Sequence, residues 1–280
     1  PYESCHGEVA MNRAKVGRGW DWNGARVVVV GLARSGIAAC RFLNRRGARV
    51  MGTDLRLASQ LGDACDTLQK EGVTMSLGAY PDLRQIDAVI LSPGVDPSQE
   101  VFLDAQQRGV LLLPELEVGA SEVRGRIVCI TGTKGKSTTT MCLHAILRGA
   151  GLDARAVGNI GEPITAHVEG SDENSVFVTE ASSFQLETTR DFHPDCSVFL
   201  NLFPDHLDRH VDFASYAEAK ARIFANQTAR DTAIVNGDDP GVMRLAARTQ
   251  ATIIPFRPRV TPDNTHNGPS AYFQGGEAVF

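Results

Sequence analysis

The sequence lacks the features that mark membrane, secreted and nucleic-acid-binding proteins. Wholly apolar stretches such as 27–30 are far too short to span a bilayer, and the charged, glycine-dotted start has no signal-peptide layout. There is no excess of positive charge, because 28 basic residues stand against 33 acidic ones and give a net charge of -5. We therefore predict no nucleic-acid or membrane partner, and any anionic ligand must be held locally.

Cysteine is scarce and scattered. The six cysteines are Cys5, Cys40, Cys65, Cys129, Cys142 and Cys196. They form no Cys-x-x-Cys pair, and most lie inside apolar segments, where a reduced thiol acts as a small hydrophobic side chain. This usage favours a cytosolic protein without a disulfide framework.

Aromatic residues are few, at 6%, but 42% of the 280 residues are hydrophobic, which is enough for one or two globular cores. Runs of Val, Ile and Leu alternate with helical stretches, a pattern typical of parallel sheets covered on both faces. We predict an α/β protein with a tail over 1–23, an N-terminal Rossmann-like parallel-sheet domain over 24–120 and a central α/β domain of the P-loop ATPase type over 121–280. The aperiodic segment 115–126 is the predicted boundary, and the stretch 253–280 is predicted to be irregular chain followed by a hairpin.

Residues 131–138, with the sequence TGTKGKST, lie between a predicted strand and a predicted helix. Such a loop offers backbone N–H groups and a helix N-terminus to an anion, a lysine to the outer phosphates and a hydroxyl to Mg²⁺. A strict P-loop has glycine where Ile130 stands, so this loop is a shortened one. The alternative is a glycine-rich turn with a solvated lysine, but the flanking strand and helix favour nucleotide binding.

Polar residues follow several other predicted strands of the second series. Glu180 follows one strand, and Asp205 and His206 follow the next. Each could have only a local role, at a helix start or in a loop. At the carboxyl edge of a sheet that also carries a phosphate loop, an acid and an imidazole predict a metal shell. The motif HLDRH at 206–210 lacks the glutamate of zinc proteases, which argues against zinc.

Lys220 occupies an unusual position for a lysine. At about 100 degrees per residue it shares the apolar face of a predicted helix over 215–226 with Tyr216 and Ile223. Such a lysine usually reaches out to water from the rim of the core. The alternative is that it points into the site, where burial would lower its pKa and make the amine reactive.

The first domain has a glycine-rich loop of its own. Residues 31–36, GLARSG, follow a strand and resemble a dinucleotide fingerprint, with Asp54 at the end of the next strand. Ala33 replaces the glycine that lets the backbone approach a pyrophosphate, so a nucleotide-type ligand other than NAD is predicted. A tight turn without a ligand and an NAD-dependent dehydrogenase are the alternatives.

Taken together, these motifs resemble those of the Mur ligase family of cell-wall synthesis. They are TGTKGKST, GNIG, EASSFQLETT, NLFPDHLDRH, YAEAKARIF and VNGDD, behind GLARSG, TDLR and SPGV, and they span residues 24–255 in order. The SSFQLE stretch is most similar to the member that adds D-glutamate to UDP-N-acetylmuramoyl-L-alanine. The resemblance implies a cytoplasmic, monomeric, ATP-dependent amide-bond ligase that acts through an acyl phosphate in peptidoglycan precursor synthesis, and so in cell shape and cell division.

The resemblance also assigns roles to individual residues. ATP would lie on Gly132, Thr133, Lys134, Gly135, Lys136, Ser137 and Thr138. Mg²⁺ would be held by Ser137, Glu180, His206 and Lys220, the last as a carbamate formed with CO₂. Lys136, His206 and Lys220 would be catalytic. UDP-N-acetylmuramoyl-L-alanine would contact Arg34, Ser35, Asp54, Arg56, Gly94, Asn159, Ser182 and Gln185.

The sequence departs from the family pattern toward its end. The family's third, C-terminal domain has no counterpart here, and His266-Asn267 is not continued as the family's adenine-contacting His-Asn-x-x-Asn motif. We therefore expect a chain that holds the first two domains, the second of them incomplete, so that complete catalysis by these 280 residues is doubtful. Another Mur ligase, a folylpolyglutamate-type ligase and a non-catalytic nucleotide-binding fragment are the alternatives.

Overall fold

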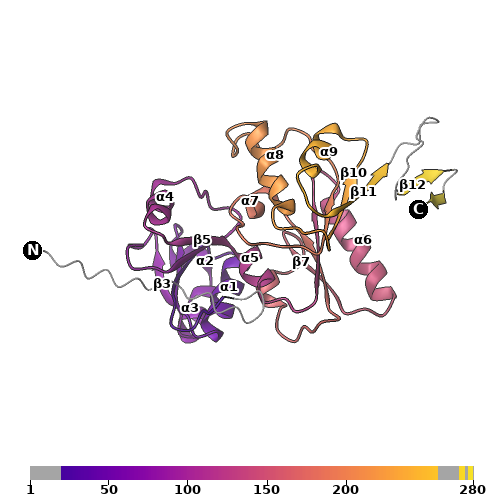
Figure 1. Ribbon diagram of the computed structural model, residues 1–280. Coiled ribbons are helices and arrows are strands. Elements are labelled where there is room, and N and C mark those ends of the chain that lie inside the picture. Colours follow the sequence, from indigo (N-terminus) through magenta and orange to yellow (C-terminus); the bar gives the residue numbers. More distant parts are fainter. Residues whose placement is uncertain (1–19, 258–270, 275–276, 280) are drawn as a thin grey trace, which may run out of the picture. The chain divides into compact units, whose positions relative to one another are not determined.

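The computed structural model describes residues 20–257, 271–274 and 277–279. The chain separates into two compact units, residues 1–122 and 123–280, each built on a sheet of parallel strands (Figure 1). The predicted α/β class with two parallel-sheet domains is confirmed. Within the described ranges, no helix is long and apolar enough to cross a bilayer.

The first unit contains a five-stranded parallel sheet. Its strands are β1 (Arg26–Val30), β2 (Arg49–Asp54), β3 (Thr74–Leu77), β4 (Ala88–Leu91) and β5 (Leu111–Pro114). Its helices are α1 (Arg34–Arg45), α2 (Ala58–Leu61), α3 (Ala64–Lys70), α4 (Glu100–Gln107) and α5 (Glu115–Ala120). The strand order is β3-β2-β1-β4-β5, with every neighbouring pair parallel, so the order reverses between β1 and β4. Ligands bind outside the strand ends at such a reversal, which is where the loop 31–36 lies.

Burial on both faces explains the composition of these strands. Val27, Val28, Val29 and Val30 are all buried, because helices cover one face and a cluster with Phe102 packs on the other. Trp22 is also buried, so the predicted tail of 1–23 is wrong at its end: Trp22 belongs to the folded unit. Residues 1–19 of that tail lie outside the described residues.

The second unit contains a larger sheet. Its strands are β6 (Arg126–Thr131), β7 (Ala154–Gly158), β8 (Val176–Glu180), β9 (Cys196–Phe199), β10 (Thr232–Asn236), β11 (Thr252–Arg257), β12 (Ala271–Gln274) and β13 (Glu277–Val279). Its helices are α6 (Lys136–Gly149), α7 (Ser183–Leu186), α8 (Phe213–Ala221) and α9 (Pro240–Ala246), with short 3₁₀ turns η1 (Ile164–Ala166) and η2 (Arg222–Phe224). The order is β13-β12-β11-β10-β9-β6-β8-β7, and only the β12–β13 pair in the described part is antiparallel.

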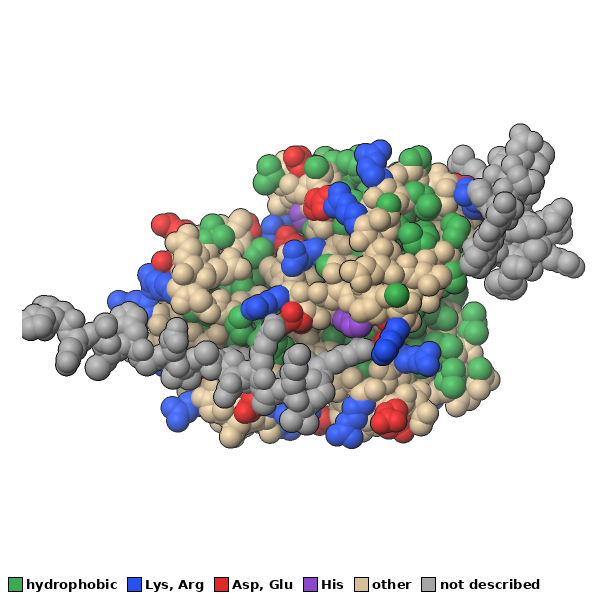
Figure 2. Space-filling model, viewed as in Figure 1, with side chains coloured by type: hydrophobic (Ala, Val, Ile, Leu, Met, Phe, Trp, Pro, Cys, Tyr) green, Lys and Arg blue, Asp and Glu red, His purple; other side chains and the backbone are tan. Residues whose placement is uncertain are grey.

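Strand β6 lies between β8 and β9 in the sheet, so the strand order changes from one side of β6 to the other as the chain passes from β8 to β9. The loops after these three strands therefore emerge side by side at the carboxyl edge. Helix α6 lies on one side of the sheet, and α8 and α9 lie on the other (Figure 1). Hydrophobic side chains are visible at the surface over α6 (Figure 2), where Met141 and Ile146 are 44% and 68% exposed.

Three local predictions needed correction. The division between the two units, between residues 122 and 123, lies within the predicted boundary 115–126, but this segment is not irregular: it contains helix α5, whose six residues are all buried and so leave no exposed polar face to produce a period. Residues 253–257, expected to be irregular, belong to strand β11 (Thr252–Arg257), which pairs with β10. The helix predicted over 215–226 begins at Phe213 and ends at Ala221. The predicted terminal hairpin is confirmed as the antiparallel β12–β13 pair.

Candidate functional site

The phosphate loop connects β6 to α6 and takes the shape that its glycines allow. Gly135 is the N-cap of α6 with a φ of 83°, a left-handed conformation that favours glycine. A Cβ on Gly132 would lie 3.1 Å from the Leu200 Cβ and 3.3 Å from the Asn201 nitrogen, so the loop packs tightly against the segment after β9. Ser137 and Thr138 are exposed at the start of the helix. The loop therefore presents a free helix N-terminus and two hydroxyls to solvent.

Two lysines meet at one carbonyl oxygen of this loop. Lys136 Nζ lies 3.0 Å from the Gly132 oxygen, and Lys220 Nζ lies 2.9 Å from the same atom. Lys136 also donates to the Thr133 oxygen at 3.0 Å. The charge of Lys136 and of the protonated fraction of Lys220 places positive charge next to the loop, as a polyphosphate ligand requires.

Lys220 is buried in the core of the site, with 2% exposure. It does not reach water, which excludes the ordinary role of a rim lysine. Burial, together with the nearby charge of Lys136, lowers the pKa of Lys220 to about 7, although the charges of Asp205 and Glu180 act in the opposite direction. Its Nζ lies 4.7 Å from the centre of the Tyr216 ring. Near neutral pH a large fraction of this amine is uncharged and nucleophilic.

Glu180 ends β8 as a buried carboxylate with 1% exposure. Its Oε1 accepts a hydrogen bond from Asn159 Nδ2 at 2.8 Å. Its Oε2 is buried and, within the part of the chain that the structure describes, has no hydrogen-bond donor. Burying a carboxylate oxygen in this way costs folding free energy unless a cation or a hydrogen-bond donor pairs with it. A hard divalent cation is a fitting partner for this oxygen, since carboxylates are the ligands that Mg²⁺ prefers.

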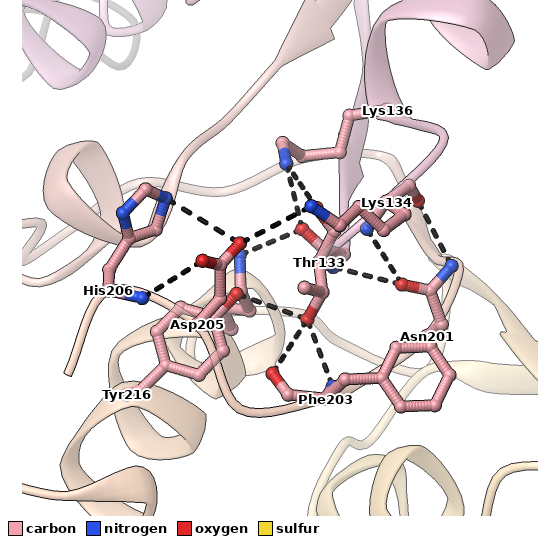
Figure 3. Close-up of polar contacts among 10 residues, drawn as sticks. Thr133, Lys134, Lys136, Asn201, Phe203, Asp205, His206 and Tyr216 are labelled. Carbon is pink, nitrogen blue, oxygen red and sulfur yellow. Dashed lines mark hydrogen bonds and ion pairs between the residues drawn. The ribbon is translucent and has the colours of Figure 1, made fainter.

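His206 lies on the exposed loop after β9 and has a backbone φ of 53°, the one positive value outside glycine among the described residues. Its Nε2 lies 3.8 Å from Asp205 Oδ2 (Figure 3). Its ring lies 5.1 Å from that of Phe184. Asp205 also approaches Lys134 Nζ, at 3.9 Å. A non-glycine residue in this conformation is held there by its surroundings, a feature found at functional sites.

The structure brings some of the predicted metal ligands together and not others. Glu180 acts electrostatically on Lys136 and Lys220, so these three residues share one site. Within the described ranges, however, no three His, Cys, Asp or Glu side chains form a metal-binding group. The Mg²⁺ roles of Ser137 and His206 therefore stay a prediction.

The predicted contacts to the muramoyl part of the substrate lie beside Glu180. Ser182 is the N-cap of α7 and forms a capping box with Gln185: its Oγ accepts the Gln185 N–H at 3.3 Å, and its own N–H donates to Gln185 Oε1 at 3.0 Å. Gln185 is 2% exposed. The turn is thereby rigid, and Asn159 is fixed by its bond to Glu180.

Sequence reasoning missed Asn201, the second residue after β9. Its Oδ1 accepts the N–H groups of Thr133 and Lys134, and its Nδ2 donates to the Lys134 oxygen (Figure 3). His210, considered from the sequence only as a zinc ligand in the HLDRH motif, is 6% exposed, and its Nε2 lies 3.0 Å from Ser183 Oγ. The strand-end rule that singled out Glu180 points equally to Asn201.

In the first unit, Asp54 at the end of β2 anchors the loop after β1. Asp54 Oδ2 accepts the Leu32 N–H at 2.9 Å and pairs with Arg56 Nη2 at 2.8 Å. The Arg56 hydrogen bond lowers the pKa of Asp54 to about 2 despite burial, which acts in the opposite direction. Ser92 Oγ donates to the Gly31 oxygen at 2.7 Å.

The remaining predicted ligands of the first unit lie at the same strand ends. Arg34 and Gly94 are exposed, and Ser35 is half-buried. Arg34 and Ser35 open α1 directly after the loop that follows β1, and Gly94 follows β4. The sheet order reverses between these two strands, so the residues surround the place where a ligand is expected.

Comparisons with known families match both units. A model of the Mur ligase middle domain matches residues 130–266, and a model of the N-terminal domain of MurD-like Mur ligases matches residues 25–113.

Curated relatives are similar over most of the chain. UDP-N-acetylmuramoylalanine–D-glutamate ligase of Acidobacterium capsulatum is 42% identical over 235 residues, which cover 83% of this chain and 51% of that protein. The enzyme of the same name from Pelotomaculum thermopropionicum is 41% identical over 241 residues, covering 85% and 53%. The chain thus spans about half the length of the curated relatives it matches.

Solved structures resemble the chain in fold alone. The UDP-N-acetylmuramate:L-alanyl-gamma-D-glutamyl-meso-diaminopimelate ligase from Neisseria meningitides aligns with a TM-score of 0.55 at 16% identity, covering 86% of this chain and 82% of that one. A murein peptide ligase from Psychrobacter arcticus aligns with a TM-score of 0.52 at 16% identity, covering 86% and 57%.

Proposed function

Because this chain belongs to the Mur ligase family, we propose that it carries the precursor-binding and ATP-using parts of a UDP-N-acetylmuramoylalanine–D-glutamate ligase. The observation that carries the proposal is the pair of lysines, Lys136 and Lys220, on the Gly132 oxygen beside the buried Glu180. Charge of both signs is concentrated there at the end of a phosphate loop, as phosphoryl transfer from ATP requires.

In the proposed reaction, the terminal carboxylate of UDP-N-acetylmuramoyl-L-alanine attacks the γ-phosphorus of ATP and ADP leaves. The amine of D-glutamate then attacks the acyl phosphate and loses a proton, and the tetrahedral intermediate expels inorganic phosphate. Both steps bring anions together, so placement and charge neutralisation supply most of the catalysis. Lys136 would neutralise the outer phosphates of ATP, and the hydroxyls of Ser137 and Thr138 would lie at the same end of the nucleotide.

Mg²⁺ would supply further neutralisation between the phosphates. Glu180 fits this ion because its Oε2 is buried without a donor within the described residues, while Asn159 fixes Oε1. Ser137 and His206 complete the proposed set. His206 is oriented by its unusual backbone and by Phe184.

We further propose that Lys220 acts as a carbamate. Its neutral amine would attack CO₂ to form an N–C bond, and the nitrogen would release one proton to solvent. The product is an anionic carbamate. It takes the place of the buried ammonium that would otherwise lie next to Lys136, and it would pair with a cation. A pKa of about 7 and burial of the side chain support this step, because the amine must first be uncharged.

The first unit would hold the uridine diphosphate. Asp54 fixes Arg56 at the end of β2, and Arg34 and Ser35 lie where the N-terminus of α1 faces an anion. This part of the proposal places the protein in the cytoplasm, where UDP-linked precursors would be its substrates. It assigns the chain to peptidoglycan synthesis, and so to cell-wall biogenesis and cell division.

Calorimetric titration tests the proposal. The chain is expected to bind UDP-N-acetylmuramoyl-L-alanine and Mg-ATP at one site each, with Asp54→Ala weakening only the former and Lys136→Ala only the latter. A sister ligase would bind a different UDP-linked precursor in preference, so UDP-N-acetylmuramate and UDP-N-acetylmuramoyl-L-alanyl-D-glutamate serve as competitors. Failure of the chain to bind either predicted ligand would contradict the proposal.

A further inference from the structure

Several hydrogen bonds join the segment after β9 to the phosphate loop. Asn201 Oδ1 lies 3.1 Å from the Thr133 nitrogen and 2.8 Å from the Lys134 nitrogen, and Asn201 Nδ2 lies 3.0 Å from the Lys134 oxygen (Figure 3). The Asn201 carbonyl oxygen also accepts the Thr133 N–H, at 3.0 Å. One side chain thus satisfies three backbone groups of the loop.

Thr133 makes a second connection between the same two segments. Its buried Oγ1 accepts the Phe203 N–H at 3.0 Å, lies 3.1 Å from the Phe203 oxygen and lies 3.1 Å from the Tyr216 hydroxyl. Tyr216 precedes Lys220 by one turn of α8. The side chain of Thr133 therefore points into the protein.

The segment after β9 is itself held from the other side. Asn236 Nδ2 donates to the Leu200 oxygen at 2.9 Å, and the Leu202 N–H donates to Asp239 Oδ2 at 2.8 Å. Asn201 therefore stands on a support fixed by β10 and α9, rather than on a free loop. A side chain on such a support can set the position of its neighbour.

We propose that Asn201 is a positioning residue of the phosphate loop. It uses up the N–H groups of Thr133 and Lys134, so that the N–H groups from Gly135 onward are those that face the phosphates. It also sets where Gly132 lies, and with it the carbonyl oxygen on which Lys136 and Lys220 meet. The inference rests on the proposed function, because it takes the nucleotide to bind at this loop.

The test compares two asparagines in the full 280-residue chain. Asn201→Ala removes the three hydrogen bonds that the side chain makes to the loop and leaves the backbone bond in place. Asn226→Ala is the matched control, since Asn226 Nδ2 also donates to two backbone oxygens, those of Arg190 and Phe192, both at 3.0 Å. Both variants are measured by calorimetric titration with Mg-ATP at a temperature where circular dichroism shows them folded.

We expect Asn201→Ala to weaken Mg-ATP binding about tenfold or more, because the Lys134 N–H loses its acceptor, the Lys134 oxygen loses its donor, and the Thr133 N–H keeps only the Asn201 backbone oxygen, so that the loop loses its fixed shape. Asn226→Ala should stay within about twofold of the unsubstituted chain. In amide-resolved NMR of the unsubstituted chain, Mg-ATP should shift Gly135, Lys136 and Ser137 strongly and Thr133 and Lys134 weakly.

Two contrary results are distinguishable. If the unsubstituted chain binds Mg-ATP and Asn201→Ala binds it equally well, the role of Asn201 is wrong while the nucleotide site stands. If the unsubstituted chain does not bind Mg-ATP, the nucleotide site is wrong, and the role of Asn201 falls with it. Strong chemical-shift changes at the Thr133 and Lys134 amides would likewise contradict the proposal that the phosphates face only the N–H groups from Gly135 onward.

Discussion

At the scale of single residues, Lys220 shows how burial converts an ordinary side chain into a reactive one. Its helix places it on the same face as Tyr216, and the core on that side removes it from water. The cost falls on the charged form, which is why its pKa drops to about 7. The sequence revealed the position on the apolar face, but the two possible orientations of the side chain could be separated only by the structure.

This pKa predicts a pH dependence of stability. Between about pH 7 and pH 10 the unfolded chain binds a proton at Lys220 that the folded chain does not. In CO₂-free buffer, the free energy of unfolding should therefore rise with pH in this range, by up to about 1.4 kcal/mol per unit from this group. Urea unfolding at several pH values should show that Lys220→Met loses this contribution, whereas Lys70→Met, at an exposed site, keeps it. An unchanged slope in Lys220→Met would contradict the assignment.

Asp54 predicts an effect at acid pH, with the opposite sign. The bond to Arg56 lowers its pKa to about 2, so its contribution to stability is present above about pH 4 and is lost as the pH falls toward 2. At pH 7, Asp54→Asn should reduce the free energy of unfolding by about 1–2 kcal/mol, and it should flatten the acid limb of the stability curve.

Asp82 provides the control for that measurement. It also pairs with an arginine, Arg84, at 2.6 Å, but both side chains are exposed to solvent. Exposed ion pairs contribute little to stability, so Asp82→Asn should leave the urea midpoint at pH 7 nearly unchanged. Equal effects of the two substitutions would show that the burial of Asp54 does not matter.

At the scale of elements, the strands were predictable and the short, fully buried helices were not. Continuous Val, Ile and Leu runs mark β1 and β4 because both sheet faces are covered. Helix α5 is buried on every side, so its sequence carries no amphipathic signal. Strand β11 lies where irregular chain was expected, and it contains Pro255, which lacks an N–H but pairs in register with Val235 of β10.

The site was predictable to the extent that it follows the strand ends. Glu180 and the phosphate loop were found in this way, because the carboxyl edge of a parallel sheet collects ligand-binding residues. The hydrogen bonds that fix them come from residues distant in sequence. Asn201 lies 67 positions from Lys134, and Asn159 lies 21 positions from Glu180. Such pairings depend on the strand order, which the sequence pattern alone did not determine.

Gly158 predicts an effect at the junction of β7 and β8. It has a φ of 102°, and a Cβ there would lie 2.3 Å from the Glu180 backbone oxygen. Gly158→Ala should therefore cost about 3 kcal/mol in the free energy of unfolding and displace Glu180, weakening Mg-ATP binding as well. Gly149→Ala is the control, because its Cβ would meet nothing within 4 Å and its φ is ordinary. An unchanged free energy of unfolding in Gly158→Ala would show that β7 and β8 can move apart without loss of stability.

At the scale of the whole molecule, the chain consists of two compact units with separate sheets. The net charge of -5 spread over the sequence means that each unit must attract its anionic ligand through local groups. In the proposed account these groups would be Arg34, Arg56 and the start of α1 in the first unit, and the phosphate loop with Lys136 in the second.

This division predicts a different pattern of protection for each ligand. A ligand protects the structure that binds it and leaves independent structure unaffected. In hydrogen exchange, UDP-N-acetylmuramoyl-L-alanine should slow exchange within residues 24–122 and, in the second unit, around Asn159, Ser182 and Gln185, whereas Mg-ATP should slow exchange within residues 123–257 only. Protection of residues 24–122 by Mg-ATP alone would contradict the assignment of the nucleotide to the second unit.

The central claim, that the chain uses ATP to activate a carboxylate, is tested most directly by trapping the acyl phosphate. Hydroxylamine displaces phosphate from such an intermediate and leaves a stable hydroxamate, which mass spectrometry detects. The chain with Mg-ATP and UDP-N-acetylmuramoyl-L-alanine should form the hydroxamate of that precursor, and Lys136→Ala should not. If both ligands bind and no hydroxamate forms above the level of Lys136→Ala, the chain binds the substrates without activating them, and the account is wrong.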